Sequence, residues 1–269
     1  MEEDFTRIWS YADTNQNKFI GELKEIVTQP SISAQNLGLK ECAEIVRGKM
    51  SALGIKTQQI PIPDAPNIIF GELESNEKTA HTLVIYNHYD VQPVEPLSEW
   101  KSDPFKPEIR ENKLYGRGVG DDKGEIAARL CAIKSIIDTG NSIRPRIRWI
   151  IEGEEETGSV HFHKFVIKNR SLLKGDGCLW EGGDRSTSGT PEVHLGVKGL
   201  LYVEYRLKVG RKDQHSMYGP IAPNPAWRLI NLLTTIRDDK GRIKIEGFYD
   251  RVAKPTAQEK EFLRNNEFD

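Results

Sequence analysis

The sequence predicts an α/β fold, in which a β-sheet is covered by helices on its faces. Three observations lead to this prediction. Two N-terminal segments repeat apolar residues at helical spacing, short β-rich runs follow, and a further helical stretch precedes the last of these runs. Strands that alternate with helices are typical of a sheet layer packed against helices. Ligands in such folds bind at the carboxyl ends of strands, so the residues after each predicted strand are candidates for a site.

The first predicted elements are two amphipathic helices, over about residues 4–27 and 36–53. Apolar residues such as Phe19 and Leu23 recur at three-to-four spacing in the first helix, which ends before Pro30. The remaining elements follow in order: β-rich runs at 55–60, 67–73 and 82–86, a helix at 124–139 and a last β-rich run at 146–151. Together they form the predicted sheet layer and its helical cover.

A second unit is predicted in the last third of the chain. Residues 182–191 are rich in glycine, serine and threonine, which is typical of a loop, and we place the domain boundary after residue 194. Residues 200–209 then alternate apolar and polar side chains, as a half-buried strand does. Residues 226–236 have the pattern of a helix entered through a Pro-Asn-Pro segment.

Composition excludes several classes of protein. The 269 residues carry a net charge of −2, without a basic stripe interleaved with aromatic residues, which argues against a nucleic-acid partner. The N-terminal residues are acidic where a secretory signal is basic and then apolar, and the apolar runs are too short to span a bilayer. The three cysteines lack C-x-x-C spacing, which fits a reducing compartment. We therefore expect a cytoplasmic protein with no membrane or nucleic-acid partner.

A histidine and a carboxylate follow the predicted strand 82–86. His88 leaves the strand end, and Asp90 stands two residues later. Imidazole binds zinc as the neutral ring, and a nearby carboxylate can hold the other ring nitrogen. A lone His-x-Asp motif is more commonly a surface or capping arrangement, so this motif needs support from others.

Two adjacent acids, Asp121 and Asp122, follow a turn that contains several glycines and open the predicted helix 124–139. One Asp at this place is explained by helix capping alone. Two acids after such a turn indicate a metal site. Glycines let the backbone approach an ion closely, and a carboxylate can bridge two cations.

Further acids follow two more predicted strands. Four carboxylates fall within residues 152–156 after one of them, and Glu181 ends the apolar segment 178–180. Closely spaced acids repel unless cations or donors compensate them, and a metal pair would supply that compensation. One acid would then bind metal while its neighbour takes a proton from water. One histidine and three carboxylates at strand ends form a much more specific set than any single motif.

These motifs, in this order and spacing, resemble those of the co-catalytic dizinc superfamily of aminoacylases, carboxypeptidases and dipeptidases. That superfamily includes acetylornithine deacetylase and succinyl-diaminopimelate desuccinylase, and its carnosinase-like dipeptidase branch looks closest. The matching segments are 87–94 (NHYDVQPV), 100–105 (WKSDPF), 114–124 (LYGRGVGDDKG) and 152–159 (EGEEETGS). The resemblance runs from the first helices to at least Gly219, so it covers most of the chain.

The resemblance implies a mixed-sheet zinc-peptidase catalytic domain with helices on both faces over residues 1–194. It also implies part of an inserted α+β, ferredoxin-like domain over residues 195–269, which acts as a lid and forms a homodimer. Chains of this superfamily continue past the position of Asp269 and return to the catalytic domain with a last metal-binding histidine. The resemblance therefore describes this sequence as C-terminally truncated.

The resemblance also implies a site for two divalent metal ions, zinc first, with manganese or cobalt as alternatives. His88 and Glu181 would bind one metal, Asp121 would bridge the two, and Glu156 would bind the other. The peptide bond between Asp121 and Asp122 is expected to be cis.

Three further residues take catalytic roles by the same resemblance. Glu155 falls on the general base, and Asp90 on the acid behind His88. His215, within residues 213–219, matches the histidine that reaches the partner subunit's active site and binds the developing oxyanion.

The function implied is hydrolysis of an amide bond in a dipeptide or similar small peptide. Carnosinase-like dipeptidases generally have Asp at the position of Glu181. The Glu of this chain looks more like the deacylase and carboxypeptidase branches. An N-acyl-amino-acid deacylase therefore stays open as an alternative. A third possibility is a non-catalytic truncated remnant that serves only as a dimer partner.

Overall fold

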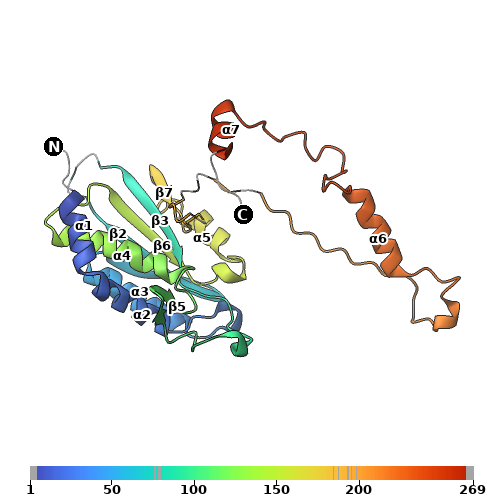
Figure 1. Ribbon diagram of the computed structural model, residues 1–269, viewed down its shortest axis with the longest axis horizontal. Helices are drawn as coiled ribbons and strands as arrows, with labels where there is room; N and C mark the ends of the chain where they lie inside the picture. Colours follow the sequence, from blue (N-terminus) through green and yellow to red (C-terminus); the bar gives the residue numbers. More distant parts are fainter. Residues whose placement is uncertain are drawn as a thin grey trace. The chain divides into compact units, whose positions relative to one another are not determined.

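The computed structural model describes residues 5–75, 77, 80–183, 185–186, 188–192, 194, 196–197 and 199–264 (Figure 1). Two units are distinguished, Met1–Gly183 and Asp184–Asp269, and each is described by itself. Along the chain, the boundary between them falls within residues 182–191, where the sequence changes composition. Asp4, where the first helix is predicted to begin, lies outside the described residues. The boundary after residue 194 stays a proposal.

The first unit is built on one five-stranded sheet with the order β1-β2-β6-β3-β7. Its strands are β1 (Lys56–Ile62), β2 (Ala65–Leu73), β3 (Thr82–His88), β6 (Arg146–Glu152) and β7 (Gly177–Leu179). The pairs β1–β2 and β2–β6 are antiparallel, whereas β3 runs parallel to both β6 and β7. The sheet is therefore mixed, and the predicted strands are confirmed.

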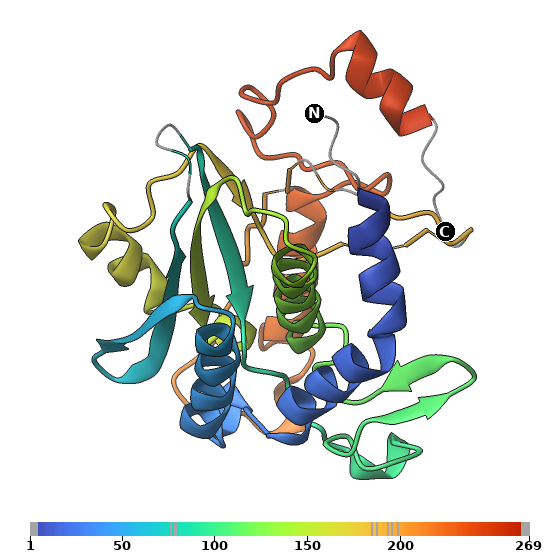
Figure 2. The ribbon, with the colours of Figure 1, turned by 90° about the vertical axis from the view of Figure 1, so that its left-hand side faces the viewer.

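Helices cover both faces of this sheet, as Figure 2 shows for α4 and α5. One face packs in a core with α2 (Gln16–Thr28), α3 (Leu39–Ala52) and α4 (Lys123–Asp138). The first helix, α1 (Phe5–Thr14), contacts α2 and α4. The other face packs against α5 (Phe162–Lys168). The predicted helices of this unit are confirmed, with a break between α1 and α2 at Asn15.

The two faces follow from the two-residue repeat of the strands. Ile85 and Trp149 lie in the core beneath α3 and α4, while their neighbours Val84 and Ile150 lie in the core beneath α5. Because successive side chains of a strand point to opposite faces, the near-continuous apolar runs are what a sheet covered on both sides requires. Trp149 is fully buried in this arrangement.

The carboxyl ends of three parallel strands meet at one edge of the sheet. His88 ends β3 and pairs in register with Glu152, which ends β6. The short helix η3 (Glu155–Thr157) follows β6, and Glu181 stands two residues after β7. This edge positions the candidate site.

Smaller elements surround this edge. They are η1 (Ser33–Gln35), η2 (Leu97–Glu99) and the hairpin of β4 (Glu108–Arg110) and β5 (Lys113–Tyr115). The hairpin turns through Glu111 and Asn112, both at positive φ. Its strands have only three residues each, too few to show a periodic pattern in the sequence.

In the second unit, the helix predicted at 226–236 is confirmed as α6 (Pro225–Ile236). Asn224 caps it, because its Oδ1 accepts a hydrogen bond of 2.8 Å from the backbone N–H of Ala226. The other helices are η4 (Ser216–Tyr218) and α7 (Ala257–Arg264).

The strand predicted at 200–209 is wrong for the described structure, where these residues form no regular element. A strand needs a hydrogen-bonded neighbour, and the described residues of the second unit supply none. The α+β architecture expected of the second domain is therefore not formed by them. Among the described residues of either unit, no helix has the length and apolar composition that crossing a membrane requires.

Candidate active site

His88 stands at the centre of a cluster of carboxylates. Its side chain is 1% exposed, and its Nε2 atom lies 2.8 Å from Asp121 Oδ1, 3.5 Å from Glu181 Oε2 and 3.9 Å from Glu155 Oε2. The chain therefore brings the predicted residues of β3, the glycine turn, η3 and the segment after β7 together around one ring nitrogen.

Asp90 holds the other side of the histidine ring. The ring Nδ1 atom of His88 lies 3.0 Å from the backbone oxygen of Asp90 and 3.3 Å from its Oδ1 atom. The two carboxylate oxygens of the buried Asp90 also accept the backbone N–H groups of Glu155 and Glu156, each at 3.1 Å. Asp90 thus orients both the histidine ring and the first turn of η3.

The glycine turn brings Asp121 and Asp122 to the start of α4, and the expected cis peptide bond between them is confirmed. Gly124 is required there, because a Cβ atom at this position would lie 1.9 Å from the backbone oxygen of Val119. Asp122 is buried, and its Oδ2 atom accepts hydrogen bonds from Asn87 Nδ2 at 2.7 Å and from the backbone N–H of His88 at 2.9 Å.

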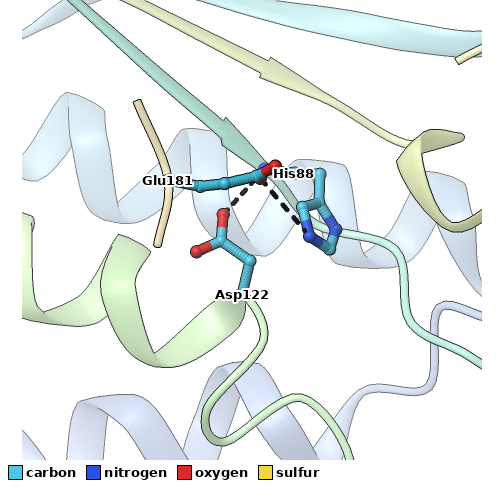
Figure 3. A group of neighbouring side chains, drawn as sticks. All are labelled: His88, Asp122 and Glu181. Carbon is cyan, nitrogen blue, oxygen red and sulfur yellow. Dashed lines mark hydrogen bonds and ion pairs between the residues drawn. The ribbon is translucent and has the colours of Figure 1, made fainter. Parts of the chain in front are cut away.

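The donor set fits a divalent cation. Ligand atoms of His88, Asp122 and Glu181 all lie within 4.8 Å of one another, and Figure 3 shows the three side chains converging. Asp122 Oδ1 and Glu181 Oε2 are buried and have no hydrogen-bond partner in the described part of the chain. Buried acceptors without donors are costly, and one imidazole with two carboxylates is a set that zinc binds. The sequence predicts Asp121 as the ligand here and does not predict Asp122.

The electrostatics of the cluster point the same way. Burial raises the pKa of Glu181 to about 8 and that of Asp122 to about 7, because a charged carboxylate loses hydration. Burial by itself lowers the pKa of His88, but hydrogen bonds to Asp121 and Asp90 outweigh it and raise the pKa to about 11. The acids therefore draw a proton onto the ring, and a cation would relieve the same excess of negative charge.

The two acids of η3 face different partners. Glu155 has its carboxylate near His88, and burial raises its pKa. Glu156 accepts hydrogen bonds from Gln92 Nε2 to its Oε2 at 2.8 Å and to its backbone oxygen at 3.0 Å. Glu156 is therefore not drawn to His88, and Gln92 is a contact that sequence reasoning missed, although it lies four residues after the histidine.

His215 belongs to the second unit and is described only within it. Its Nδ1 atom accepts the backbone N–H of Met217 at 3.1 Å and so caps η4. Its predicted role at a partner's active site stays a prediction.

A mixed sheet with histidine and carboxylate groups gathered at its carboxyl edge defines the class of this protein as an α/β protein with a candidate metallohydrolase site. Comparison with known proteins gives the family. The model of peptidase family M20/M25/M40 matches residues 84–263, more than half of the chain. The chain belongs to this family, and the predicted resemblance is confirmed.

Individual relatives are similar over nearly the whole chain. Beta-Ala-His dipeptidase of Rattus norvegicus is 28% identical over 98% of this chain and 57% of its own length. Cys-Gly metallodipeptidase of Candida albicans is 30% identical over 93% of this chain and 56% of its own length. The crystal structure of an M20 family metallo-carboxypeptidase from Sulfolobus solfataricus superposes with a TM-score of 0.86 and 40% identity, covering 93% of this chain and 57% of that one. The chain thus spans less than two thirds of each relative.

Proposed function

We propose that this chain carries the catalytic site of a metal-dependent peptidase that hydrolyses the amide bond of a dipeptide. The observation that carries the proposal is the convergence of Asp121, Glu181 and Glu155 on one nitrogen of His88, within 2.8 to 3.9 Å. The chain covers 57% of the length of the Rattus norvegicus relative. The catalytic activity of the whole protein is therefore part of this proposal.

In this proposal His88, Asp121 and Glu181 hold one divalent ion, with Asp122 as a further candidate through its unpartnered Oδ1 atom. Glu156 would bind a second ion, and Asp121 would be a ligand shared by the two. Such ions lower the pKa of water and polarise a carbonyl group. Zinc fits the mixed imidazole and carboxylate set, and manganese or cobalt are the alternatives.

Glu155 is the proposed general base. Its carboxylate lies 3.9 Å from His88 Nε2, farther than those of Asp121 and Glu181, and its raised pKa brings proton uptake closer to neutral pH, where a base is most effective. Asp90 is the proposed positioning residue for the base, because it binds the backbone N–H of Glu155 as well as the ring of His88. His215 of a partner subunit is the proposed donor to the developing oxyanion.

A dipeptide is the favoured substrate class because the Rattus and Candida relatives are both called dipeptidases. One observation favours a second candidate, a carboxypeptidase acting on longer peptides: the Sulfolobus metallo-carboxypeptidase is 40% identical to this chain. The deacylase alternative has no comparable support.

A substrate panel tests these alternatives. The purified protein, with zinc or manganese added, would be assayed on dipeptides, on tripeptides with the same C-terminal residue and on the matching N-acetyl amino acids. Preference for dipeptides supports the proposal, and preference for tripeptides supports the carboxypeptidase. Bound metal without turnover of any substrate would instead indicate the non-catalytic remnant.

The remaining parts of the proposal are a cytoplasmic location and a homodimer formed through the second unit. Exposed apolar side chains support the dimer, such as Leu200 at 89% and Trp227 at 66% exposure. Light scattering measures the mass directly, and a monomer at high concentration would contradict the dimer.

A further inference from the structure

Glu181 lies where the sheet no longer fixes the backbone. The ladder between β7 and β3 joins three pairs and ends at Ile85 and Leu179, two residues before Glu181. A metal-binding carboxylate must nevertheless be held in a narrow range of positions beside the other ligands. Another part of the structure therefore has to fix this segment.

Two side chains of α4 hold the backbone on both sides of Glu181. Arg129 donates from Nη2 to the backbone oxygen of Trp180 at 2.6 Å. The backbone N–H of Gly182 donates to both carboxylate oxygens of Glu125, at 2.9 and 3.0 Å. Arg129 and Glu125 are themselves paired at 3.0 Å. The peptide groups that flank the residue are thus bound to the two members of one ion pair.

The same guanidinium also reaches the strand that carries the histidine. Arg129 Nη1 donates to the backbone oxygen of Tyr86 at 2.6 Å and to Asn87 Oδ1 at 2.5 Å. Asn87 in turn donates from Nδ2 to Asp122. One planar group therefore connects the residue before Glu181 with the two residues before His88, and its side chain is 12% exposed.

We propose that Arg129, together with Glu125, is a positioning residue that fixes the Glu181 carboxylate beside His88 and thereby sets the affinity for metal. This inference rests on the metal site of the proposed function. An ordinary pair four residues apart on a helix contributes little because both groups stay in water. Here the hydrogen bonds leave the helix and end on two other elements. A lysine has one compact ammonium group and cannot reproduce the fork that reaches both.

The first test compares two Arg→Lys variants of the full chain. Arg129→Lys should weaken zinc binding by about 10- to 100-fold, the usual loss when a group that orients a ligand is removed. Arg146→Lys is the matched control, because Arg146 pairs with the half-exposed Glu74 at the opposite end of β6. Zinc affinity would be measured by competition with a chelating indicator, and thermal unfolding without zinc would show whether the variants fold alike.

A double-mutant cycle then separates a positioning role from a general loss of structure. Glu181→Ala should weaken zinc binding, and adding Arg129→Lys to it should cause no further loss, because the ligand that Arg129 positions is gone. If Arg129→Lys does not fold, Glu125→Ala replaces it in the cycle, since that change removes the contact to Gly182 and the pairing with Arg129 but leaves the contacts of Arg129 to β3.

The outcomes are distinguishable. Wild-type affinity in Arg129→Lys, with weakened binding in Glu181→Ala, overturns the positioning role and leaves the metal site standing. Losses that add in the double variant also overturn it. Unchanged affinity in Glu181→Ala removes the ligand itself and overturns both this inference and the proposed metal site.

Discussion

The two units of the chain treat apolar residues in opposite ways. In Met1–Gly183, apolar positions of α2, α3 and α4 pack in a core with the sheet, and Trp149 is completely buried. In the second unit, α6 has an equally amphipathic pattern, yet none of its residues is buried and Trp227 is 66% exposed. An amphipathic pattern is therefore sufficient to predict a helix but not a core. Burial needs a second apolar surface, and the described residues of the second unit do not provide one.

The largest expected difference between the units is in stability. Trp149→Ala should lower the free energy of unfolding by about 3–5 kcal/mol, because it opens a cavity between α4 and the sheet. It also removes the hydrogen bond of 2.9 Å from Trp149 Nε1 to Asn87 Oδ1. Trp227→Ala is the matched control and should stay within about 0.5 kcal/mol. Urea unfolding followed by circular dichroism measures both, and equal losses would contradict the comparison.

Catalysis should depend on the first unit, where the two acids of η3 have different roles. Glu155→Gln keeps the shape of the side chain but removes the proton acceptor, so turnover by the active protein should fall by a factor of about 10² or more while metal content stays near normal. Glu156→Gln should instead reduce metal content. If Glu155→Gln loses metal and Glu156→Gln does not, the two roles are exchanged.

Metal binding by the first unit should release protons. In the metal-free chain His88, with a pKa of about 11, and Glu181, with a pKa of about 8, both hold protons at neutral pH. A cation must displace these protons, so affinity should strengthen as pH rises, by about tenfold per pH unit for each proton released. Titration calorimetry in buffers of different ionisation enthalpy should find more than one proton per zinc ion at neutral pH, and fewer above the pKa of Glu181. Binding without proton release would contradict the buried cluster.

The smallest expected effect lies in the second unit. Asn224→Ala removes the cap of α6 and should destabilise that helix by about 1 kcal/mol, whereas Asn224→Asp keeps an acceptor and should not. Hydrogen exchange of the α6 amides measures the change. Zinc affinity and the unfolding of the first unit should be unaffected, and a shift in either would show that the units are coupled.

The elements of the first unit were predictable because their patterns are local and long. The β3 and β6 strands are apolar runs of the right length, and α4 begins directly after two acids that follow a glycine turn. The β4–β5 hairpin was not predicted, since three-residue strands show no period. The strand at 200–209 was predicted wrongly. Alternating apolar and polar residues show that a segment is suited to a sheet, but they do not show whether a neighbouring strand is there to pair with it.

The candidate site was predictable to the extent that strand ends reveal it. His88, Glu155 and Glu181 each follow a predicted strand, and the structure brings them together. The contacts of Arg129 and Asn87 were not predictable, because they join segments that are far apart in the chain and no local pattern marks them. The buried oxygen of Asp122 belongs with these, since its neighbours come from β3 and from the segment after β7.

The most direct test of the central claim, that the metal site lies at the sheet edge of the first unit, is a zinc-binding measurement on two histidine variants. Histidine is exchanged once in each unit, as His88→Ala and His215→Ala, and zinc affinity is measured by chelator competition on the full chain. We predict that His88→Ala loses tight binding and that His215→Ala binds zinc as the wild type does. Tight binding retained by His88→Ala, or lost by His215→Ala, would contradict it.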